Sequence, residues 1–253
     1  MESVQRAMEI LRLSLEGPPG VSISVTEMAA ALHVSKSTVS RLLDTLAAAG
    51  FLVADPATRR YNVGPLAFAF GSRFEGAALA RAVTPLLKNL MELTGCTAQF
   101  GTIQGNFTRF LSVVESNQPL RVVVAPGNTR YAHASAVGKA ILASLSTGAL
   151  SDFVDALRTP DGLLPRVGPG TIVQPEALEQ ELVLTAKRGY SLSLEETTAG
   201  VVALGAFVPS QHEPHFAVSI AFAKGLYTDA EYPGLVKTLH TMAQQMSEVL
   251  KGN

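Results

Sequence analysis

The residues Val137-Gly138-Lys139 are candidates for chemistry, because they suggest a loop that binds a nucleotide phosphate. Such a loop follows the pattern Gly-x-x-x-x-Gly-Lys-Ser/Thr, because its glycines let the backbone approach the phosphates and its hydroxyl binds Mg²⁺. Here His133 occupies the position of the first glycine, and Ala140 occupies the position of the hydroxyl. The pattern fails at both positions, and we therefore predict no nucleotide-phosphate site.

Other reactive residues also fail as catalytic or metal sites. Cys96 is the single cysteine and has no His or Cys at metal-ligand spacing nearby. His212 and His215 flank an expected hairpin turn, which is a poor geometry for a metal. Glu195 and Glu196 are adjacent in an expected strand, so their side chains would point to opposite faces. We therefore predict no catalytic set, no metal and no cofactor, in a protein that is not an enzyme.

The segment from His133 to Gly138 is better interpreted as the start of a helix. Free backbone N–H groups and the helix dipole favour an anion there, so His133, Ser135 and Gly138 are candidate binding residues for a ligand carboxylate. Arg130 could also face such a head group, although an exposed arginine is the simpler interpretation. A purely structural role is the alternative: His133 and Ser135 would cap the helix, and Gly138 would permit tight packing.

A two-faced helix is predicted from Lys36 to Ala49, with Ser35 as its N-cap and Gly50 as its stop. One face is an apolar stripe. The other face carries hydroxyl and basic side chains that can contact phosphates or base edges in the major groove of DNA. These candidate DNA-binding residues are Lys36, Ser37, Thr38, Ser40 and Arg41.

Shorter elements must position that helix. An amphipathic helix is expected near the start of the chain, and Ser24 and Glu27 form a capping box in front of a second short helix. A short helix, a tight turn and a two-faced helix together make a helix-turn-helix. Residues 51–63 are then predicted to form a hairpin wing, whose turn carries Arg59 and Arg60 toward the phosphate backbone.

Charge favours a DNA-binding protein that acts as a multimer. The whole chain has 20 basic and 21 acidic residues, for a net charge of −1, and residues 1–64 hold equal numbers of each. A domain without net charge binds DNA weakly on its own, so we infer a homodimer or a larger assembly. The single cysteine excludes a disulfide within the chain, and no signal core or bilayer-spanning apolar run is present, so we expect a cytoplasmic protein without a membrane partner.

The rest of the chain mixes helix-like and strand-like patterns. Helices are expected at 65–74, 78–93, 133–145, 175–188 and 229–250, and strands at 96–103, 107–115, 120–125, 190–195, 201–208 and 216–223. Several strands are joined by hairpins, which favours an α+β domain with an antiparallel-rich sheet. We place a DNA-binding domain at 1–64, a linker helix at 65–77 and an effector-binding domain at 78–253.

Five segments resemble those of the IclR family of bacterial transcription regulators. Those in the first half are Val4-Gln-Arg-Ala-Met-Glu-Ile-Leu, Val34-Ser-Lys-Ser-Thr-Val-Ser-Arg-Leu-Leu and Tyr61-Asn-Val-Gly-Pro-Leu. Those in the second half are His133-Ala-Ser-Ala-Val-Gly-Lys-Ala and Gly189-Tyr-Ser-Leu-Ser-Leu-Glu-Glu, the latter followed by Gly200. The matches follow the family's order over nearly the whole chain.

The resemblance implies a winged helix-turn-helix, a linker helix and a GAF-like α/β effector-binding domain. It also implies dimers or tetramers that bind double-stranded DNA at a palindromic operator and control neighbouring catabolic genes in response to a small-molecule effector. By the same resemblance, the effector pocket contains Ala136, Val137, Ser193, Val201, Ala203, Ser219 and Ala221.

This sequence departs from the family pattern at three pocket positions. The expected acidic residue is Ser193, the expected cysteine is Ala203, and one of two expected serines is Ala221. The pocket should therefore be roomier, less acidic and less polar than in members that bind small keto acids. Donors would remain at Ser193, at Ser219 and along the backbone from 134 to 138. We expect an effector with a flat or branched apolar body and one carboxylate or carbonyl head, such as an aromatic catabolic intermediate.

Two functions of other classes remain alternatives to a ligand-responsive regulator. One is an enzyme or metabolite-binding module fused to a DNA-binding domain. The other is an architectural protein that binds DNA regardless of its sequence. Turnover of a metabolite would indicate the first, and equal binding to random DNA would indicate the second.

Overall fold

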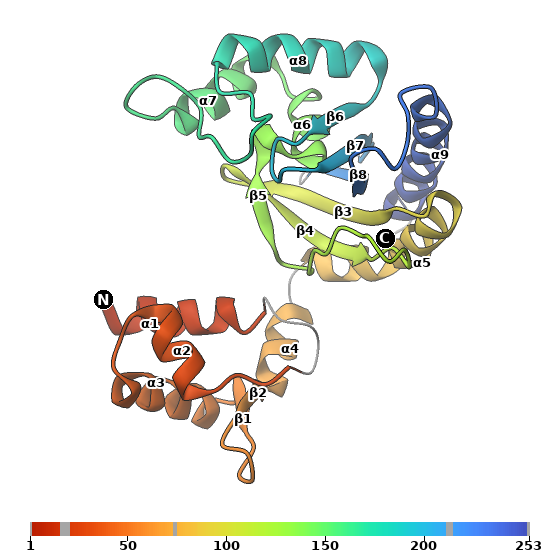
Figure 1. Ribbon diagram of the computed structural model, residues 1–253. Helices are drawn as coiled ribbons and strands as arrows, with labels where there is room; N and C mark the ends of the chain where they lie inside the picture. The colour runs from red at the N-terminus through yellow and green to blue at the C-terminus, as the bar shows by residue number, and fades with distance from the viewer. Residues whose placement is uncertain (1, 16–20, 73–74, 211–214, 252–253) are drawn as a thin grey trace. The chain divides into compact units, whose positions relative to one another are not determined.

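The computed structural model describes the chain except for residues 1, 16–20, 73–74, 211–214 and 252–253. The chain divides into two compact units, Met1–Ala78 and Leu79–Asn253 (Figure 1). The expected turn with His212 lies outside the described residues. The separation of a linker at 65–77 from both domains stays a prediction, since the boundary between the units falls inside a helix that begins at Glu75.

In the first unit, helices are followed by a short antiparallel hairpin. The elements are α1 (Glu2–Leu13), α2 (Val25–Leu32), α3 (Lys36–Ala48), β1 (Leu52–Ala54), β2 (Tyr61–Val63) and α4 (Pro65–Ser72). Their shared apolar core contains Ile10, Met28, Ala29, Val39, Leu43, Leu46, Leu52 and Tyr61. Burial of these residues fixes α3 against α1, α2 and the hairpin, which is the arrangement of a winged helix-turn-helix.

Capping residues set the limits of α2 and α3. The Ser24 hydroxyl accepts the N–H of Glu27 at 3.2 Å, and the Glu27 carboxylate accepts the N–H of Ser24 at 2.8 Å, which confirms the predicted capping box. Ser35 caps α3 by accepting the N–H of Thr38 at 3.2 Å. His33, between the two helices, has φ 52°, a left-handed conformation that ends α2 and makes the turn tight.

The second unit is built on a six-stranded antiparallel sheet with the strand order β5-β4-β3-β8-β7-β6. The strands are β3 (Thr97–Gln104), β4 (Phe107–Val114), β5 (Thr129–Tyr131), β6 (Ser191–Leu194), β7 (Val201–Val208) and β8 (Phe216–Ala223). Central strands β3 and β8 pair although they are distant in the sequence. This sheet confirms the predicted α+β class and its antiparallel pairing.

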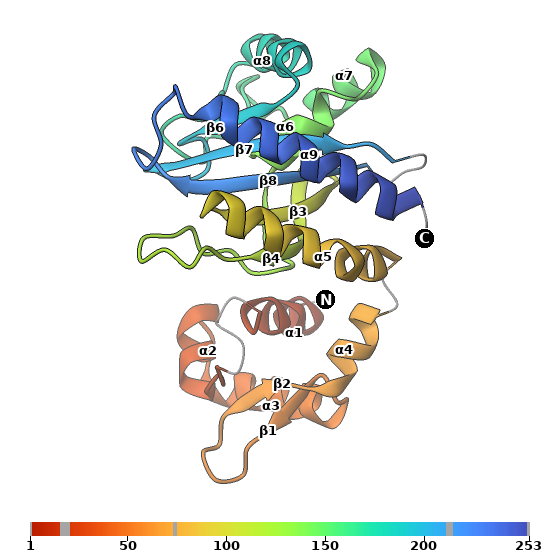
Figure 2. The same cartoon turned by 90° about the vertical axis from the view of Figure 1, so that its right-hand side faces the viewer.

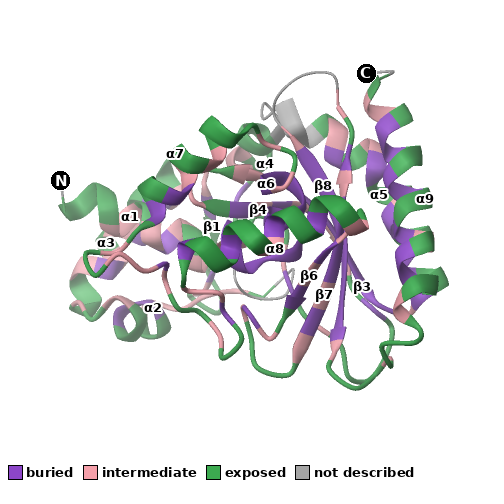
Figure 3. Ribbon diagram, turned by 90° about the horizontal axis from the view of Figure 1, so that it is seen from above, coloured by how far each residue is buried: buried purple, intermediate pink, exposed green. Residues whose placement is uncertain are grey.

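Helices cover both faces of the sheet (Figure 2). The elements are α5 (Glu75–Thr94), the 3-10 turn η1 (Ala132–Ala134), α6 (Ala136–Leu142), α7 (Thr147–Leu157), α8 (Pro175–Arg188) and α9 (Tyr232–Lys251). Val218 and Ile220 of β8 share a core with α5 and α9, whereas Ala217 packs with α6 on the opposite face. Buried residues accordingly follow the strands and one side of α9 (Figure 3).

Some predictions of strands and helices were wrong. Residues 120–125 form no strand, and β5 pairs with the outer edge of β4 only along Phe107–Arg109. They are an extended segment that is held where Thr97 donates its hydroxyl proton to the Val122 carbonyl oxygen at 2.7 Å. The helix expected at 133–145 is η1 followed by the seven-residue α6, and α7 was not predicted. In the described part of the chain, no helix is long and apolar enough to cross a membrane.

Candidate functional site

The exposed face of α3 presents polar side chains, as predicted. Lys36, Ser37 and Arg41 are exposed, while the apolar stripe of the helix is buried in the core of the unit. Thr38 and Ser40 are half-buried, and the Ser40 hydroxyl already donates to a carboxylate one turn along the helix, at 3.5 Å. Lys36, Ser37 and Arg41 are therefore the side chains of this face that are best placed to reach DNA.

The wing carries one exposed arginine and one that is held within the unit. Arg59 is exposed at the turn and has φ 53°. Arg60 turns back, and its guanidinium donates to the Ser22 carbonyl oxygen at 2.7 Å and to the Glu27 carboxylate at 2.8 Å. The hydrogen bond from Arg60 lowers the pKa of the Glu27 carboxyl. Both arginines were expected to face phosphates, but Arg60 makes its contacts inside the protein.

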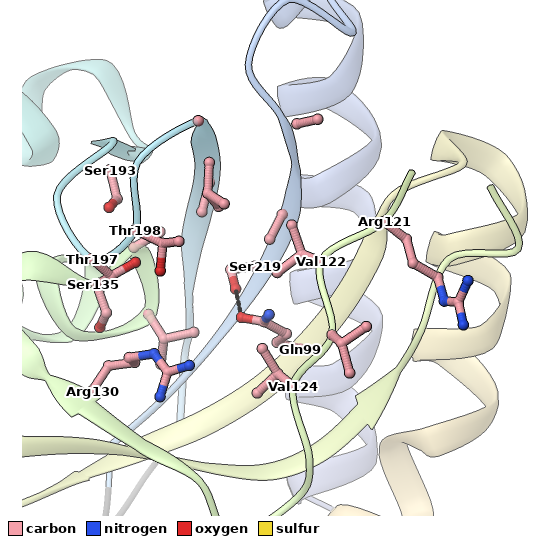
Figure 4. Close-up of a pocket in the computed structure, with 18 of the residues that line it drawn as sticks. Gln99, Arg121, Val122, Val124, Arg130, Ser135, Ser193, Thr197, Thr198 and Ser219 are labelled. Atoms are coloured by element: carbon pink, nitrogen blue, oxygen red, sulfur yellow. Dashed lines mark hydrogen bonds between the residues drawn. The ribbon is translucent and has the colours of Figure 1, made fainter. Parts of the chain in front are cut away.

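A pocket of about 450 Å³ lies between the sheet and the start of α6 in the second unit (Figure 4). Predicted effector residues that line it are Ser135, Ala136, Val137, Ser193, Val201, Ala203, Ser219 and Ala221. Lining residues that sequence analysis did not assign are Gln99, Phe110, Leu120, Arg121, Val122, Val123, Val124, Thr197, Thr198, Ala199, Gly200 and Ala223. Many of these come from two segments, 120–124 and 197–200, whose place depends on the folded sheet.

Three small side chains lie side by side on neighbouring strands and form the floor of the pocket. Ser193 of β6 pairs with Ala203 of β7, and Ala203 pairs in turn with Ala221 of β8. These are the positions at which the family resemblance implied an acid, a thiol and a hydroxyl. Because neighbouring strands place paired residues side by side, the floor is a continuous patch of small side chains.

The serine hydroxyls predicted as ligand donors are engaged within the protein. Ser193 donates to the Ala134 carbonyl oxygen at 2.8 Å, and Ser219 donates to Oε1 of Gln99 at 3.2 Å. This corrects the expectation that both serines offer donors, because a hydroxyl has a single proton to donate. The bond from Ser219 instead orients the Gln99 amide. Its Nε2 makes no hydrogen bond within the described residues and remains a donor for a ligand.

Arg130 is the cation that the pocket offers to a ligand. It is half-buried and lies on the same side of the pocket as Ser135, Thr197 and Thr198 (Figure 4). Its guanidinium donates to a neighbouring backbone carbonyl at 2.9 Å, whereas Arg121 is paired with a carboxylate at 3.3 Å. Among the described lining residues there is no Asp or Glu, so the electrostatic field of the pocket favours an anion. The structure thus supports a ligand-facing Arg130 over an arginine directed only to solvent.

His133 and Gly138 are absent from the described lining, and their contacts are structural. His133 is buried, and its Nε2 lies 3.0 Å from the Pro165 carbonyl oxygen, so Nε2 carries the proton. Burial lowers the pKa of His133 to about 4. A Cβ at Gly138 would lie 2.1 Å from the Ala132 carbonyl oxygen, so glycine lets α6 pack closely on the preceding turn. The structural alternative thus fits Gly138, and it fits Ser135, which caps α6 by accepting the N–H of Gly138 at 2.9 Å. His133 does not cap the helix, because it lies inside the turn η1.

A buried ion network that was not predicted from the sequence lies behind the pocket. Lys139 is fully buried, and its ammonium contacts the Leu192 carbonyl oxygen and the Glu196 carboxylate, with a Glu181 oxygen 3.5 Å away. Burial raises the pKa of Glu196 to about 7, and Lys139 opposes that rise. Glu195 and Glu196 lie beyond the end of β6, so their expected place in a strand was wrong. The signal in the sequence was a lysine inside an otherwise apolar helix.

The remaining candidates for reactive chemistry are buried or paired. Burial raises the pKa of the Cys96 thiol to about 11, so the thiol stays protonated at neutral pH and is a poor nucleophile. Glu195 is ion-paired with Lys224. No group of three or more His, Cys, Asp or Glu in the described ranges could hold a metal ion.

Both halves of the chain match family models. Residues 3–56 match the IclR helix-turn-helix domain, and residues 73–248 match the C-terminal domain of the bacterial transcriptional regulator IclR. The chain is 37% identical over 207 residues to the HTH-type transcriptional regulator BhcR of Paracoccus denitrificans, which covers 81% of this chain and 71% of that protein. It is 31% identical over 233 residues to the transcriptional repressor IclR of Escherichia coli, with coverage of 90% and 82%.

A solved structure has the same fold. It is an IclR homolog from Microbacterium hydrocarbonoxydans complexed with 4-hydroxybenzoate; it covers 99% of this chain and 100% of its own, with a TM-score of 0.77 and 19% identity. The fold, the two family models and relatives above 30% identity lead to one conclusion. The chain belongs to the IclR family of bacterial transcriptional regulators, which bind DNA through a helix-turn-helix.

Proposed function

We propose that this regulator is a cytoplasmic homodimer or homotetramer that changes its affinity for a palindromic operator when a small carboxylate with an aromatic or similarly apolar body binds the pocket. A catabolic operon for such a compound is the natural target. The observation that carries the proposal is the combination of Arg130, apolar walls and no carboxylate in the described lining.

The shape of the pocket favours a larger acid over a two-carbon or three-carbon keto acid. A flat floor of small side chains and a volume of about 450 Å³ leave room for a ring. The Arg130 guanidinium can bind a carboxylate through two N–H groups. The Gln99 amide, which lines the same pocket, can donate to a second oxygen of the ligand. The Microbacterium homolog complexed with 4-hydroxybenzoate shows that this fold can hold an acid of that class.

The first unit supports DNA binding by more than one copy. Its basic and acidic residues balance, so several phosphate-contacting surfaces are needed for tight binding. Apolar side chains are exposed on two of its helices: Val4 and Met8 on α1, and Phe68 and Phe70 on α4. A second copy of this chain would remove such surface from water, which supports a homodimer.

We also propose that the regulator does not turn over its ligand. The pocket hydroxyls of Ser193 and Ser219 donate to oxygens within the protein, and among the described residues neither makes a hydrogen bond with a His, Asp or Glu side chain that could activate it. The buried His133 lies outside the described lining of the pocket. Binding without chemistry therefore fits the arrangement best.

Thermal unfolding of the full chain with a panel of acids tests the proposal. A ligand that binds only the folded protein raises its melting temperature, with about 2.7 kcal/mol gained at a hundredfold excess over Kd. We expect benzoate and 4-hydroxybenzoate to raise the melting temperature, and their neutral analogue benzamide to raise it much less. Stabilisation by glyoxylate alone would contradict the proposed ligand class.

The acid that binds is then added to a gel-shift assay with operator DNA and with random DNA of equal length. We expect it to change binding to the operator far more than binding to random DNA. Equal effects on both DNAs would favour an architectural protein, and consumption of the acid during incubation would favour an enzyme.

A further inference from the structure

Lys139 occupies an unusual place for a charged side chain. Every residue of α6 is buried, and Lys139 itself has no exposed surface. Its ammonium contacts the Leu192 carbonyl oxygen at the edge strand β6 and the Glu196 carboxylate just beyond that strand. Both contacts lie more than fifty positions away in the sequence, so the lysine joins distant parts of the unit.

The ion network continues to α8. A Glu181 oxygen lies 3.5 Å from Nζ of Lys139, and the same carboxylate accepts from Arg188 at 2.6 Å. Nε of Arg188 donates to the Tyr190 carbonyl oxygen at 2.6 Å, at the entry to β6. Two cations and two carboxylates therefore balance each other behind the pocket.

Glu196 is the first residue of the loop 196–200. We call this segment the pocket loop, because residues 197–200 line the pocket. Besides the ion pair, its carbonyl oxygen accepts the Thr171 hydroxyl proton at 2.7 Å. The other end of the loop is closed by Glu195, which accepts the N–H of Gly200 at 2.8 Å and pairs with Lys224. The loop is thus fixed at both ends, and its hydroxyl side chains keep a set position beside Arg130.

The other wall of the pocket belongs to the same helix as Lys139. Ser135, Ala136 and Val137 begin α6 and line the pocket. Since Lys139 lies within one turn of these residues, its ion pair with Glu196 connects the two walls directly. A shift of the Glu196 carboxylate would change the width of the pocket between α6 and the pocket loop.

Stability alone does not explain a buried ion pair. Well-packed apolar residues at such a site are often as stabilising or more so, because two buried charges lose their hydration. An ion pair with additional hydrogen bonds instead fixes the partners' positions, since its geometry is directional. We propose that Lys139 and Glu196 are positioning residues for the effector, and that their ion pair holds the pocket loop against α6 in the ligand-binding arrangement. The ligand-affinity part of this inference rests on the function proposed above.

The test uses the full-length chain with the variants Glu196→Gln, Lys139→Met and the apolar double variant K139M/E196L. The matched control is Lys88→Met, which removes an exposed lysine that pairs with Glu92 at 3.8 Å on α5. Hydrogen exchange reports on the amides of residues 197–200 without ligand, calorimetry gives the affinity for 4-hydroxybenzoate, and a gel shift gives ligand-free operator affinity.

We expect exchange in the pocket loop to become at least tenfold faster in E196Q and in the double variant, and the 4-hydroxybenzoate affinity to fall at least tenfold. Operator affinity should stay within twofold, and K88M should match the wild type in every measurement. The double variant is decisive. Its apolar side chains can restore the melting temperature of the wild type without restoring the ion pair that holds the pocket loop. Unchanged exchange in E196Q, or full acid affinity in a stable double variant, would overturn the inference. If the wild type binds no aromatic acid, the proposed ligand class fails, while the exchange comparison still decides the role of the pair.

Discussion

The guanidinium of Arg60 contacts the carboxylate of Glu27 at 2.8 Å, so the second strand of the wing is tied to the start of α2. Glu27 also completes the capping box of that helix with Ser24. One carboxylate therefore serves both the cap and the wing. Arg60 is better explained as part of the folded unit than as a phosphate contact, which leaves Arg59 as the exposed cation of the wing turn.

The two wing arginines should behave differently when each is replaced with alanine. Arg59→Ala should weaken binding to operator and random DNA similarly and should reduce the steepness of its salt dependence, because a phosphate contact releases counterions. Arg60→Ala should lower the melting temperature of the DNA-binding unit, because it removes hydrogen bonds to Ser22 and Glu27. Salt titrations and thermal unfolding separate the two effects. A stable R60A protein with the DNA defect expected of R59A would show that Arg60 contacts phosphate after all.

Arg41 on the exposed face of α3 is expected to read a base. Arg41→Ala should weaken operator binding by about 1–3 kcal/mol and relax specificity at one position in each half-site. The measurement is a competition assay with operators changed at single positions. Arg166→Ala, at an exposed arginine of the other unit, is the control. Full operator affinity in a folded R41A protein would exclude base reading by this side chain.

Arg130 should supply the charge that binds the effector head group. Arg130→Gln should weaken binding of the aromatic acid by about 2 kcal/mol, or about thirtyfold, because a hydrogen-bonded ion pair with the carboxylate is lost. Arg121→Gln is the matched control, since Arg121 also lines the pocket but is paired with Glu115. Calorimetry on both variants gives the comparison. An equal loss in both, or no loss in R130Q, would place the head group elsewhere.

Filling the floor of the pocket should remove the ligand response alone. Ala203 lies between Ser193 and Ala221 in the strand register, so Ala203→Phe would occupy the space proposed for the ring. We expect the variant to bind operator DNA like the wild type. In a gel shift, adding the acid should not change its operator affinity. Ala203→Ser, which adds little volume, should keep the response. A normal response of A203F at the usual acid concentration would show that the ligand binds at another site.

Burial of His133 should make the second unit sensitive to mild acid. Its folded-state pKa of about 4 lies below the ordinary histidine pKa of 6.5, so the folded state binds fewer protons. The stabilisation is fully present above pH 6.5 and is lost progressively as pH falls from 6.5 to about 4. At pH 5 the loss should be about 2 kcal/mol. Urea unfolding at pH 7 and pH 5 should show a smaller drop for His133→Gln than for the wild type, and equal drops would contradict the buried neutral ring.

Local patterns predicted elements where they were strong. Strands β7 and β8 have the predicted bounds, because each is an apolar run between turn residues. Helix α8 also matches, because Pro175 starts it and Gly189, with φ 79°, ends it. Residues 120–125 are also mostly apolar, apart from Arg121, but form no strand. A strand also needs backbone hydrogen bonds to a neighbour, and segment 120–125 is held instead by a side-chain bond from Thr97, which is distant in the sequence.

The ion pairs and some pocket residues could not be predicted from the sequence, because they depend on contacts between distant residues. Arg60 and Glu27 are 33 positions apart, and Lys139 and Glu196 are 57 apart. No periodicity or motif links such residues before the chain folds. The pocket residues on β6, β7 and β8 were named from the family resemblance, whereas Gln99 became visible only through its bond to Ser219.

The close contact at Gly138 has a consequence for how this regulator can diversify. Because a side chain there would collide with the Ala132 carbonyl oxygen, the backbone of that wall is set by packing and not by the ligand. The floor is different, since Ala203 and Ala221 contribute small side chains without polar atoms, whereas Ser193 is bonded to the Ala134 carbonyl oxygen. What is recognised can therefore change at the floor while the frame around it stays the same. A transcriptional biosensor for a new acid could be engineered at Ala203 and Ala221 without redesigning the part that reads DNA.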